Sequence, residues 1–279
     1  MKVANHRLTD DAGKALQFSL SPNCGGALKP RVLVMHYTAG RSSQSACSWL
    51  CNTKAKAAAH IVIGKDGDVT QLVPFNVRAW HAGPSAWQVG GKRVVGLNAC
   101  SIGIELDNPG RLVRRGGKWR SLSLGLEFAD AAVLEAVHKH ESAACGWALY
   151  PAAQLEAAFE VAAALIERYQ LEEIVGHEDI APLRKSDPGP AFPMDSFRAR
   201  LLGRGADDDI DRLVTSEPAN LRSGAGTQHA PVIAKMLPRG TRVQLLAADG
   251  SWRKVDVLDT VDGVNDLHGW IHGRLLKNA

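Results

Sequence analysis

The first part of the chain has apolar runs of strand length, separated by a segment with helical spacing. Residues 31–40, RVLVMHYTAG, are a β-branched apolar run and predict a buried strand. Residues 43–57 place their apolar side chains at helical spacing. Residues 58–73 predict a hairpin, because the central Lys-Asp-Gly supplies a turn that tolerates positive φ. Residues 100–110, CSIGIELDNPG, predict a further, alternating strand that Asn-Pro-Gly closes.

Two longer segments predict helices. One covers residues 122–145 and ends at Gly146, and the other covers residues 151–170 and opens with proline in its first turn. EEIVG, at residues 172–176, predicts the last strand of this region. Strands interleaved with helices predict an α/β domain in which helices flank a mixed central β-sheet.

The pattern changes after residue 203. GRGADDDID departs abruptly in composition and predicts a linker. We therefore expect a domain at 1–203, a linker at 204–212 and a second domain at 213–279. That last segment holds short alternating strands between Gly, Pro and Asp turns, which is typical of a small all-β barrel.

Composition narrows the class of protein. Of 279 residues, 45% are hydrophobic and 22% charged, as in a soluble globular protein. No apolar run approaches the ~20 residues of a membrane-spanning helix. The N-terminus lacks the apolar segment of a standard secretory signal, so we expect synthesis in the cytoplasm without one. The net charge is +4 without a basic run, which predicts no nucleic-acid partner.

The five cysteines form no CxxC pair. Cys47 and Cys51 lie four residues apart in a predicted helix and share one face, so a disulfide between them stays open. The odd number and the lack of a regular spacing favour reduced, mostly buried thiols.

Three residues have the character of metal ligands. His36 ends the first strand, His177 follows the last one, and Asp187 closes the loop beyond it. A catalytic zinc site uses three N or O ligands and one open position for water. Two imidazoles and one carboxylate leave the ion a positive charge, which lowers the pKa of bound water towards ~7. Each residue alone has a simpler interpretation, as a strand-end histidine or a turn-forming aspartate.

Glu105 and Lys185 are candidates for the chemistry itself. Glu105 stands among apolar neighbours in GIEL, where burial of a carboxylate is costly unless it is paired or functional. It is either a general base that takes a proton from metal-bound water or a glutamate on the solvent face of an alternating strand. Lys185 lies two residues before Asp187 and could direct its charge at a developing oxyanion.

The motifs VMHYTAG, AAHIVIGKDG, RAWHAGPSAW, NACSIGIEL and VGHEDIAPLRKSDPG occur in this order, over residues 30–193. They resemble those of the zinc-dependent N-acetylmuramoyl-L-alanine amidases of the type-2 amidase family, whose superfamily includes peptidoglycan recognition proteins. The resemblance implies the type-2 amidase fold, Zn²⁺ as cofactor, and peptidoglycan as partner through its glycan strand and stem peptide. It also implies hydrolysis of the amide between the lactyl group of N-acetylmuramic acid and L-alanine.

The resemblance assigns roles residue by residue. It implies that a zinc-bound water attacks the amide carbonyl after Glu105 takes its proton, while Lys185 helps to hold the oxyanion. The implied zinc ligands are His36, His177 and Asp187. The residues that match positions near the substrate groove are His60, Trp80, His81 and Asn98, and for His60 a purely structural role stays open. His138 and His140 fall in a predicted helix outside any motif, so we expect both at the surface.

The C-terminal segment resembles bacterial SH3-like domains in NLRSGAGTQHAPVIAKMLPRGTRVQLL and GWIHGRLL. The resemblance implies binding of cell-wall peptide or glycan, with Trp252, Trp270 and His268 as candidate contacts. A stabilising or partner-docking barrel stays open as the alternative, because aromatic residues of so small a barrel also form its core.

The biological setting has three interpretations. The first is a hydrolase of polymeric wall, acting in the periplasm or outside the cell as a lysin or a secretion-system effector. Its further partners would be an immunity protein or the secretion apparatus. The second is a cytoplasmic amidase that recycles anhydro-muropeptides. The third is a non-catalytic recognition protein, which the complete set of implied ligands disfavours.

Overall fold

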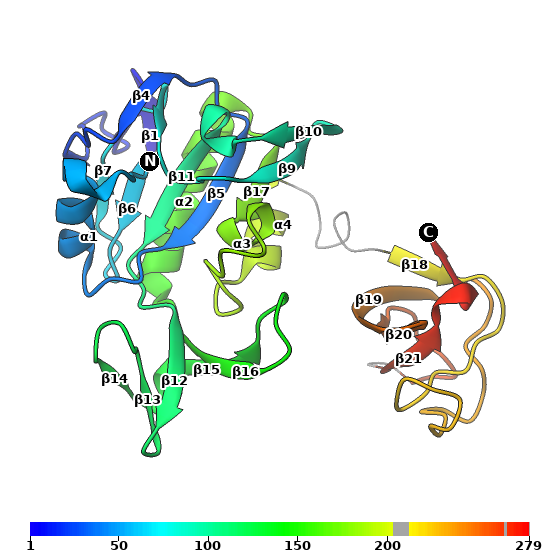
Figure 1. The fold of residues 1–279 in the computed structure, drawn as a ribbon. Helices are drawn as coiled ribbons and strands as arrows, with labels where there is room; N and C mark the ends of the chain where they lie inside the picture. The colour runs from blue at the N-terminus through cyan, green and yellow to red at the C-terminus, as the bar shows by residue number, and fades with distance from the viewer. Residues whose placement is uncertain (203–211, 265–266, 279) are drawn as a thin grey trace. The chain divides into compact units, whose positions relative to one another are not determined.

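The computed structural model describes residues 1–202, 212–264 and 267–278, and forms two compact units, Met1–Leu202 and Gly203–Ala279 (Figure 1). The predicted linker, residues 204–212, lies outside the described residues except for Arg212. No helix in the described part of the chain is long and apolar enough to cross a membrane.

A mixed six-stranded sheet forms the centre of the N-terminal unit, as predicted. Its strands have the order β17-β5-β11-β6-β7-β3. The pairs β17–β5, β5–β11, β11–β6 and β7–β3 are parallel, whereas β6–β7 is the predicted antiparallel hairpin. The bounds are β3 (Gln17–Phe18), β5 (Val32–Tyr37), β6 (Ile61–Ile63), β7 (Val69–Gln71), β11 (Ser101–Leu106) and β17 (Glu173–Gly176).

The two faces of this sheet have different partners. Leu33, Met35 and Ile104 point to one face, where they form a core with the long helix α2 (Ala152–Tyr169). Val32 and Val34 point to the other face. Since side chains alternate along a strand, His36 belongs to this second face, away from α2. Burial on both faces explains why β5 is an almost continuous apolar run.

The shorter elements surround this core (Figure 1). Helix α1 (Ser43–Leu50) begins with a capping box at Ser42, and α4 (Met194–Leu202) packs beside α2. The helix α3 (His177–Ile180) directly follows β17. The remaining elements are β1 (Lys2–Ala4), β2 (Arg7–Thr9), β4 (Cys24–Ala27), η1 (Thr53–Ala55), β8 (Val77–Ala79), β9 (Ala86–Val89), β10 (Lys92–Val95) and η2 (Leu97–Ala99).

The helix predicted over residues 122–145 is wrong. The region instead contributes β14, β15 and the start of β16 to a five-stranded sheet of order β14-β13-β12-β16-β15. Gly125 interrupts the predicted helix at a φ of +66°, and Gly146 lies within a strand, where a Cβ would come 2.6 Å from the Trp119 ring. Strand pairing within the folded unit thus overrides the local preference for a helix. The elements are β12 (Arg111–Arg115), β13 (Lys118–Arg120), β14 (Glu127–Phe128), η3 (Asp130–Ala132), β15 (Val133–Val137) and β16 (Ala144–Ala148).

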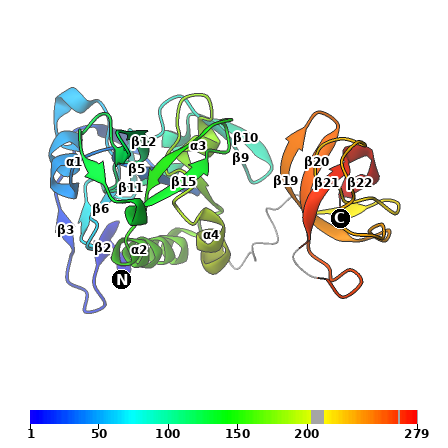
Figure 2. The same ribbon diagram turned by 90° about the horizontal axis from the view of Figure 1, so that it is seen from below.

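The C-terminal unit is a small all-β domain, as predicted (Figure 2). Its sheet has the order β21-β20-β19-β18-β22 and encloses an apolar core that includes Leu221, Val255 and Ile271. The elements are β18 (Arg212–Thr215), β19 (Arg242–Asp249), β20 (Trp252–Val257), β21 (His268–His272), η4 (Gly273–Leu275) and β22 (Leu276–Asn278).

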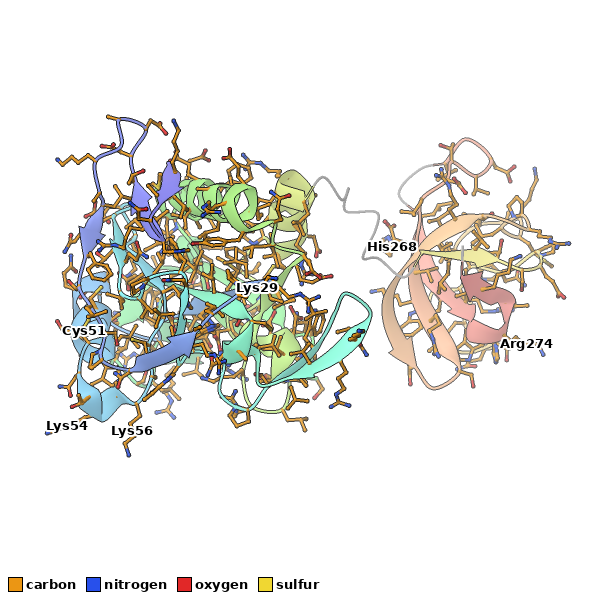
Figure 3. The ribbon with its side chains drawn as sticks, turned by 90° about the horizontal axis from the view of Figure 1, so that it is seen from above. Lys29, Cys51, Lys54, Lys56, His268 and Arg274 are labelled. Carbon is orange, nitrogen blue, oxygen red and sulfur yellow. The ribbon has the colours of Figure 1, made fainter. Side chains whose placement is uncertain are left out.

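All five cysteines lie in described segments and are free thiols, so Cys47 and Cys51 are not bonded to each other. Cys51 follows α1, where it is labelled in Figure 3. Only Cys145 is buried and the other four are half-buried, so the expectation of mostly buried thiols is wrong for those four.

Candidate metal centre and active site

Three predicted ligands converge where neighbouring strands end. His36 lies near the end of β5, and His177 opens α3 directly after β17, the strand parallel to β5. The loop beyond α3 returns Asp187 to the same place, where its carbonyl accepts from the Glu178 N–H at 2.9 Å. His36 Nδ1 lies 2.9 Å from His177 Nδ1 and 2.9 Å from Asp187 Oδ2. His177 Nδ1 and Asp187 Oδ2 are 3.0 Å apart, so the three candidate ligand atoms, which belong to buried residues, form a nearly equilateral triangle.

The outer nitrogen of each ring shows where its proton lies. His177 Nε2 is 3.1 Å from the Ala82 carbonyl, which can only accept, and 3.3 Å from Arg184 Nη2, which can only donate, and the shorter contact assigns the proton to Nε2. Ser101 Oγ donates to the Leu97 carbonyl and accepts from His81 Nε2 at 3.1 Å. His81 Nδ1 therefore accepts from His36 Nε2 at 3.0 Å. The outer nitrogen of each ring is thus engaged elsewhere, and both Nδ1 atoms face inward as the candidate ligand atoms.

The three inward atoms fit a divalent cation. Two imidazole nitrogens and one carboxylate oxygen are all acceptors, and acceptors 2.9–3.0 Å apart repel one another without a positive charge between them. Tetrahedral Zn²⁺ bonds N and O at ~2.0–2.1 Å, which separates its ligand atoms by roughly 3.3 Å. The triangle is only a few tenths of an ångström tighter. In the described part of the chain, this is the one cluster of His, Cys, Asp or Glu with such convergence.

The titration properties of the ligands also favour a cation. Burial lowers the pKa of His36 to about 4, in spite of the nearby Asp187 carboxylate, which raises it. Burial alone would raise the pKa of Asp187, but in the metal-free protein hydrogen bonds and positive charge from the inward side of His177 and His36 hold it well below its usual range, and a bound cation would take the place of those protons. A neutral imidazole beside an ionised carboxylate is the state in which both bind a metal.

Glu105 lies beside this triangle on β11. Burial, the largest cause, and the charge of Asp187 together raise the pKa of its carboxyl to about 8, although the charge of Lys185 lowers it. Its buried Oε2 has no hydrogen-bond partner among the described residues. A carboxyl group that titrates near neutral pH and keeps an unused oxygen is suited to accept and return a proton.

Glu105 and Lys185 line different cavities. The first, of about 330 Å³, is bounded by Glu105, residues 38–41, Leu124 and the α1 face that carries Trp49. The second, of about 400 Å³, is lined by Lys185, Arg184, Arg111 and neighbouring residues. Lys185 also contributes a positive charge at His36, so it lies within electrostatic reach of the centre.

The candidates around the groove separate into different environments. His60 is fully buried; its Nε2 donates to the Val77 carbonyl and its Nδ1 accepts from the Gly103 N–H, both at 3.0 Å. His81 is also buried, behind His36. Asn98 Oδ1 accepts from the backbone N–H groups of His81 and Ala82, at 3.1 and 2.7 Å. Of these candidates only Trp80, with 43% of its surface exposed, reaches solvent widely.

His138 corrects the expectation of a surface residue. It is 2% exposed, and its Nε2 lies 2.7 Å from Glu178 Oε2, beside the ligand His177. His140 is exposed, as expected. The burial of His138 depends on a carboxylate 40 residues away. The local sequence around His138 therefore does not predict that this side chain is buried.

In the C-terminal unit, Trp270, His268 and Lys254 share a cavity of about 320 Å³. Figure 3 labels His268. Trp252 does not line this cavity and instead packs edge-on against His272, with ring centres 5.4 Å apart. The structure therefore brings two of the three candidate wall-binding residues together.

Two segments of the chain match known protein families. The profile of the N-acetylmuramoyl-L-alanine amidase family matches residues 26–190, and that of the bacterial SH3 domain matches residues 217–277. The chain is 33% identical over 237 residues to the N-acetylmuramoyl-L-alanine amidase AmiD of Escherichia coli, covering 81% of this chain and 68% of AmiD. It is 36% identical to the 1,6-anhydro-N-acetylmuramyl-L-alanine amidase AmpD of Enterobacter cloacae, covering 55% of this chain and 61% of AmpD.

Similar solved structures include a selenomethionine derivative of AmpD, with 25% identity and a TM-score of 0.47 over 72% of this chain and 99% of that one. Another is E. coli AmiD in complex with anhydro-N-acetylmuramic acid-L-Ala-D-γ-Glu-L-Lys, with 31% identity and a TM-score of 0.46 over 64% and 60% of the two chains. The match of the family profile to more than half of the chain settles its membership. The chain belongs to the N-acetylmuramoyl-L-alanine amidase family.

Proposed function

We propose that this protein is a zinc-dependent hydrolase of the amide bond between N-acetylmuramic acid and the L-alanine of the stem peptide. The observation that carries the proposal is the triangle of three inward-facing acceptor atoms with Glu105 beside it. Membership of the family supplies the substrate class. His36, His177 and Asp187 would hold the ion.

Separate residues have separate roles in the proposed reaction. A bound Zn²⁺ would supply Lewis-acid polarisation and a water of lowered pKa. Glu105 Oε2 accepts a proton from the attacking water and returns it to the departing alanine nitrogen, for which its pKa of about 8 is suited. Lys185 places a fixed positive charge where the amide oxygen becomes negative.

Polymeric wall is the substrate that we propose. A bacterial SH3 domain follows the catalytic unit, and its cavity at Trp270 is a candidate second contact with wall. A second attachment raises the effective concentration of the enzyme on a polymer but offers little on a small soluble substrate. We also predict that the protein acts as a lysin or a secretion-system effector and that it is delivered across the cell envelope to reach the wall.

Small anhydro-muropeptides are the alternative substrate, since the AmpD relatives carry 1,6-anhydro-N-acetylmuramyl-L-alanine in their names. Mass spectrometry of products from purified sacculi and from anhydro-muropeptides, with and without a chelator, separates the two. We expect free stem peptides that begin at L-alanine from sacculi, and only when metal is present. Cleavage of the small substrate alone would favour the recycling alternative. Binding without cleavage of either would mean a recognition protein.

A further inference from the structure

The ligand loop, residues 176–189, is held from outside by the β15–β16 hairpin. Glu178 directly follows the ligand His177, and only 5% of its surface is exposed. Its Oε2 accepts from His138 Nε2 at 2.7 Å and from the Gly189 N–H at 3.1 Å. Gly189 lies two residues beyond the ligand Asp187. One buried carboxylate therefore ties both ends of the ligand loop to each other and to the hairpin.

The His138 ring is itself fixed. Its Nδ1 accepts from the His140 N–H at 3.3 Å, which leaves Nε2–H to donate to Glu178. The ring stacks on Trp147, with ring centres 5.4 Å apart and planes inclined by 28°. Trp147 in turn covers Gly189, where a Cβ would come 2.6 Å from its ring. These contacts leave the His138 ring a single orientation.

Lys139 supplies the charge at the same hairpin tip. Its Nζ lies 2.8 Å from Glu178 Oε1 and also pairs with Asp179. Asp179 Oδ2 accepts from the Gly176 N–H at 2.7 Å, at the start of the ligand loop. A buried carboxylate without such partners carries a large desolvation penalty. The loop can keep two carboxylates next to His177 because Lys139 of the hairpin pairs with both and Arg198 of α4 pairs with Asp179.

We propose that His138 is a positioning residue of the metal centre, which acts through Glu178 to hold His177 and Asp187 in ligating geometry. The inference rests on the proposed zinc site. Residues that orient the ligands of a metal control its affinity, and their loss typically weakens binding ~10–100-fold.

The test compares His138→Ala with His138→Gln in the full chain. The Zn²⁺ dissociation constant is measured by competition with a chromophoric chelator, and the ligand field by the visible spectrum of the Co²⁺-loaded protein. We expect His138→Ala to bind Zn²⁺ at least ~10-fold more weakly and to show an altered Co²⁺ spectrum. His138→Gln should remain close to wild type, because its amide can donate from a position near that of Nε2. The matched control is Glu135→Ala, an exposed change on β15 that should alter neither readout.

The double variant with Glu178→Ala shows whether His138 acts through that carboxylate. Once Glu178 is removed, His138→Ala should weaken Zn²⁺ binding little further, so the two effects are not additive. If His138→Ala does not fold, His138→Gln and Glu178→Ala decide, with Zn²⁺ binding near wild type in the first and weakened in the second. Wild-type affinity in a folded His138→Ala protein would overturn the inference, as would additive effects. Failure of the wild-type protein to bind Zn²⁺ would instead reject the zinc site on which the inference rests.

Discussion

His36 and Glu105 occupy the same register position on the neighbouring parallel strands β5 and β11. Both side chains point to the face of the sheet away from α2, because Met35 and Ile104, one residue earlier on each strand, point towards it. The sheet therefore fixes a metal ligand and the candidate proton carrier side by side. Two rigid strands, rather than loops, set the distance between the ion site and the base.

Asp187→Ala should remove zinc from the protein. The change takes away the anionic ligand and leaves two neutral imidazoles, which form an incomplete site. Metal analysis after dialysis should give well below one zinc per chain, while the wild-type protein keeps about one. Full occupancy in the variant would exclude Asp187 as a ligand.

Glu105→Gln should keep the metal and lose the reaction. The amide has nearly the shape of the carboxyl group but cannot take up a proton, so we expect turnover to fall by ~10²–10⁴-fold. The measurement is product release by mass spectrometry, together with zinc content. Glu135→Gln, an exposed change of the same chemistry, serves as control. Turnover at the wild-type rate would remove Glu105 from the mechanism.

Glu105 should also make the stability of the metal-free protein depend on pH. The pKa of its carboxyl rises from 4.5 in the unfolded chain to about 8 in the folded one. Between pH 4.5 and about 8 the folded state binds one proton more than the unfolded state. The contribution of Glu105 to the free energy of unfolding is therefore complete below pH 4.5 and is lost as the pH rises to about 8. In denaturant unfolding, the free energy of unfolding of Glu105→Gln should rise relative to that of the wild-type protein over this pH range, by up to a few kcal/mol at pH 8. A constant difference between the two proteins would contradict the raised pKa.

Gly103→Ala should disturb the centre without touching a ligand. A Cβ at this position would come 2.6 Å from the His81 ring, whose Nδ1 accepts a hydrogen bond from His36 Nε2–H. Displacing His81 frees His36 to rotate or to change tautomer, so Zn²⁺ affinity should fall ~10-fold or more. Chelator competition measures this effect. Unchanged affinity in a folded variant would mean that His81 does not orient His36.

Ending the chain at Leu202 should separate chemistry from attachment. The first unit contains the whole candidate site, so cleavage of soluble muropeptides should be unchanged. Release of peptides from sacculi should fall if the second unit holds the enzyme on polymer. Equal loss on both substrates would instead assign the second unit a role in folding or in the reaction itself.

The strands of the central sheet could be predicted because burial on both faces makes them continuous apolar runs. The segment at 122–145 could not, because its Ala, Leu and Glu residues favour a helix, while in the fold β15 and β16 form a hairpin that is completed by pairing of β16 with the earlier strand β12. The ligands followed from their residue types and from family resemblance. The proton positions on His36 and His81 depend on Ser101 and Leu97, and that on His177 depends on the Ala82 carbonyl. The spacing of residues along the chain does not encode that arrangement.

The ligands of the candidate centre are far apart along the chain. His177 follows His36 by 141 residues and Asp187 follows it by 151. During synthesis, the growing chain therefore contains only one of the three ligands until nearly the whole first unit has been made. A fragment that stops short of residue 187 lacks the carboxylate and cannot complete the ion site. The order of the ligands thus withholds hydrolytic activity from incomplete chains and couples it to completion of the first unit.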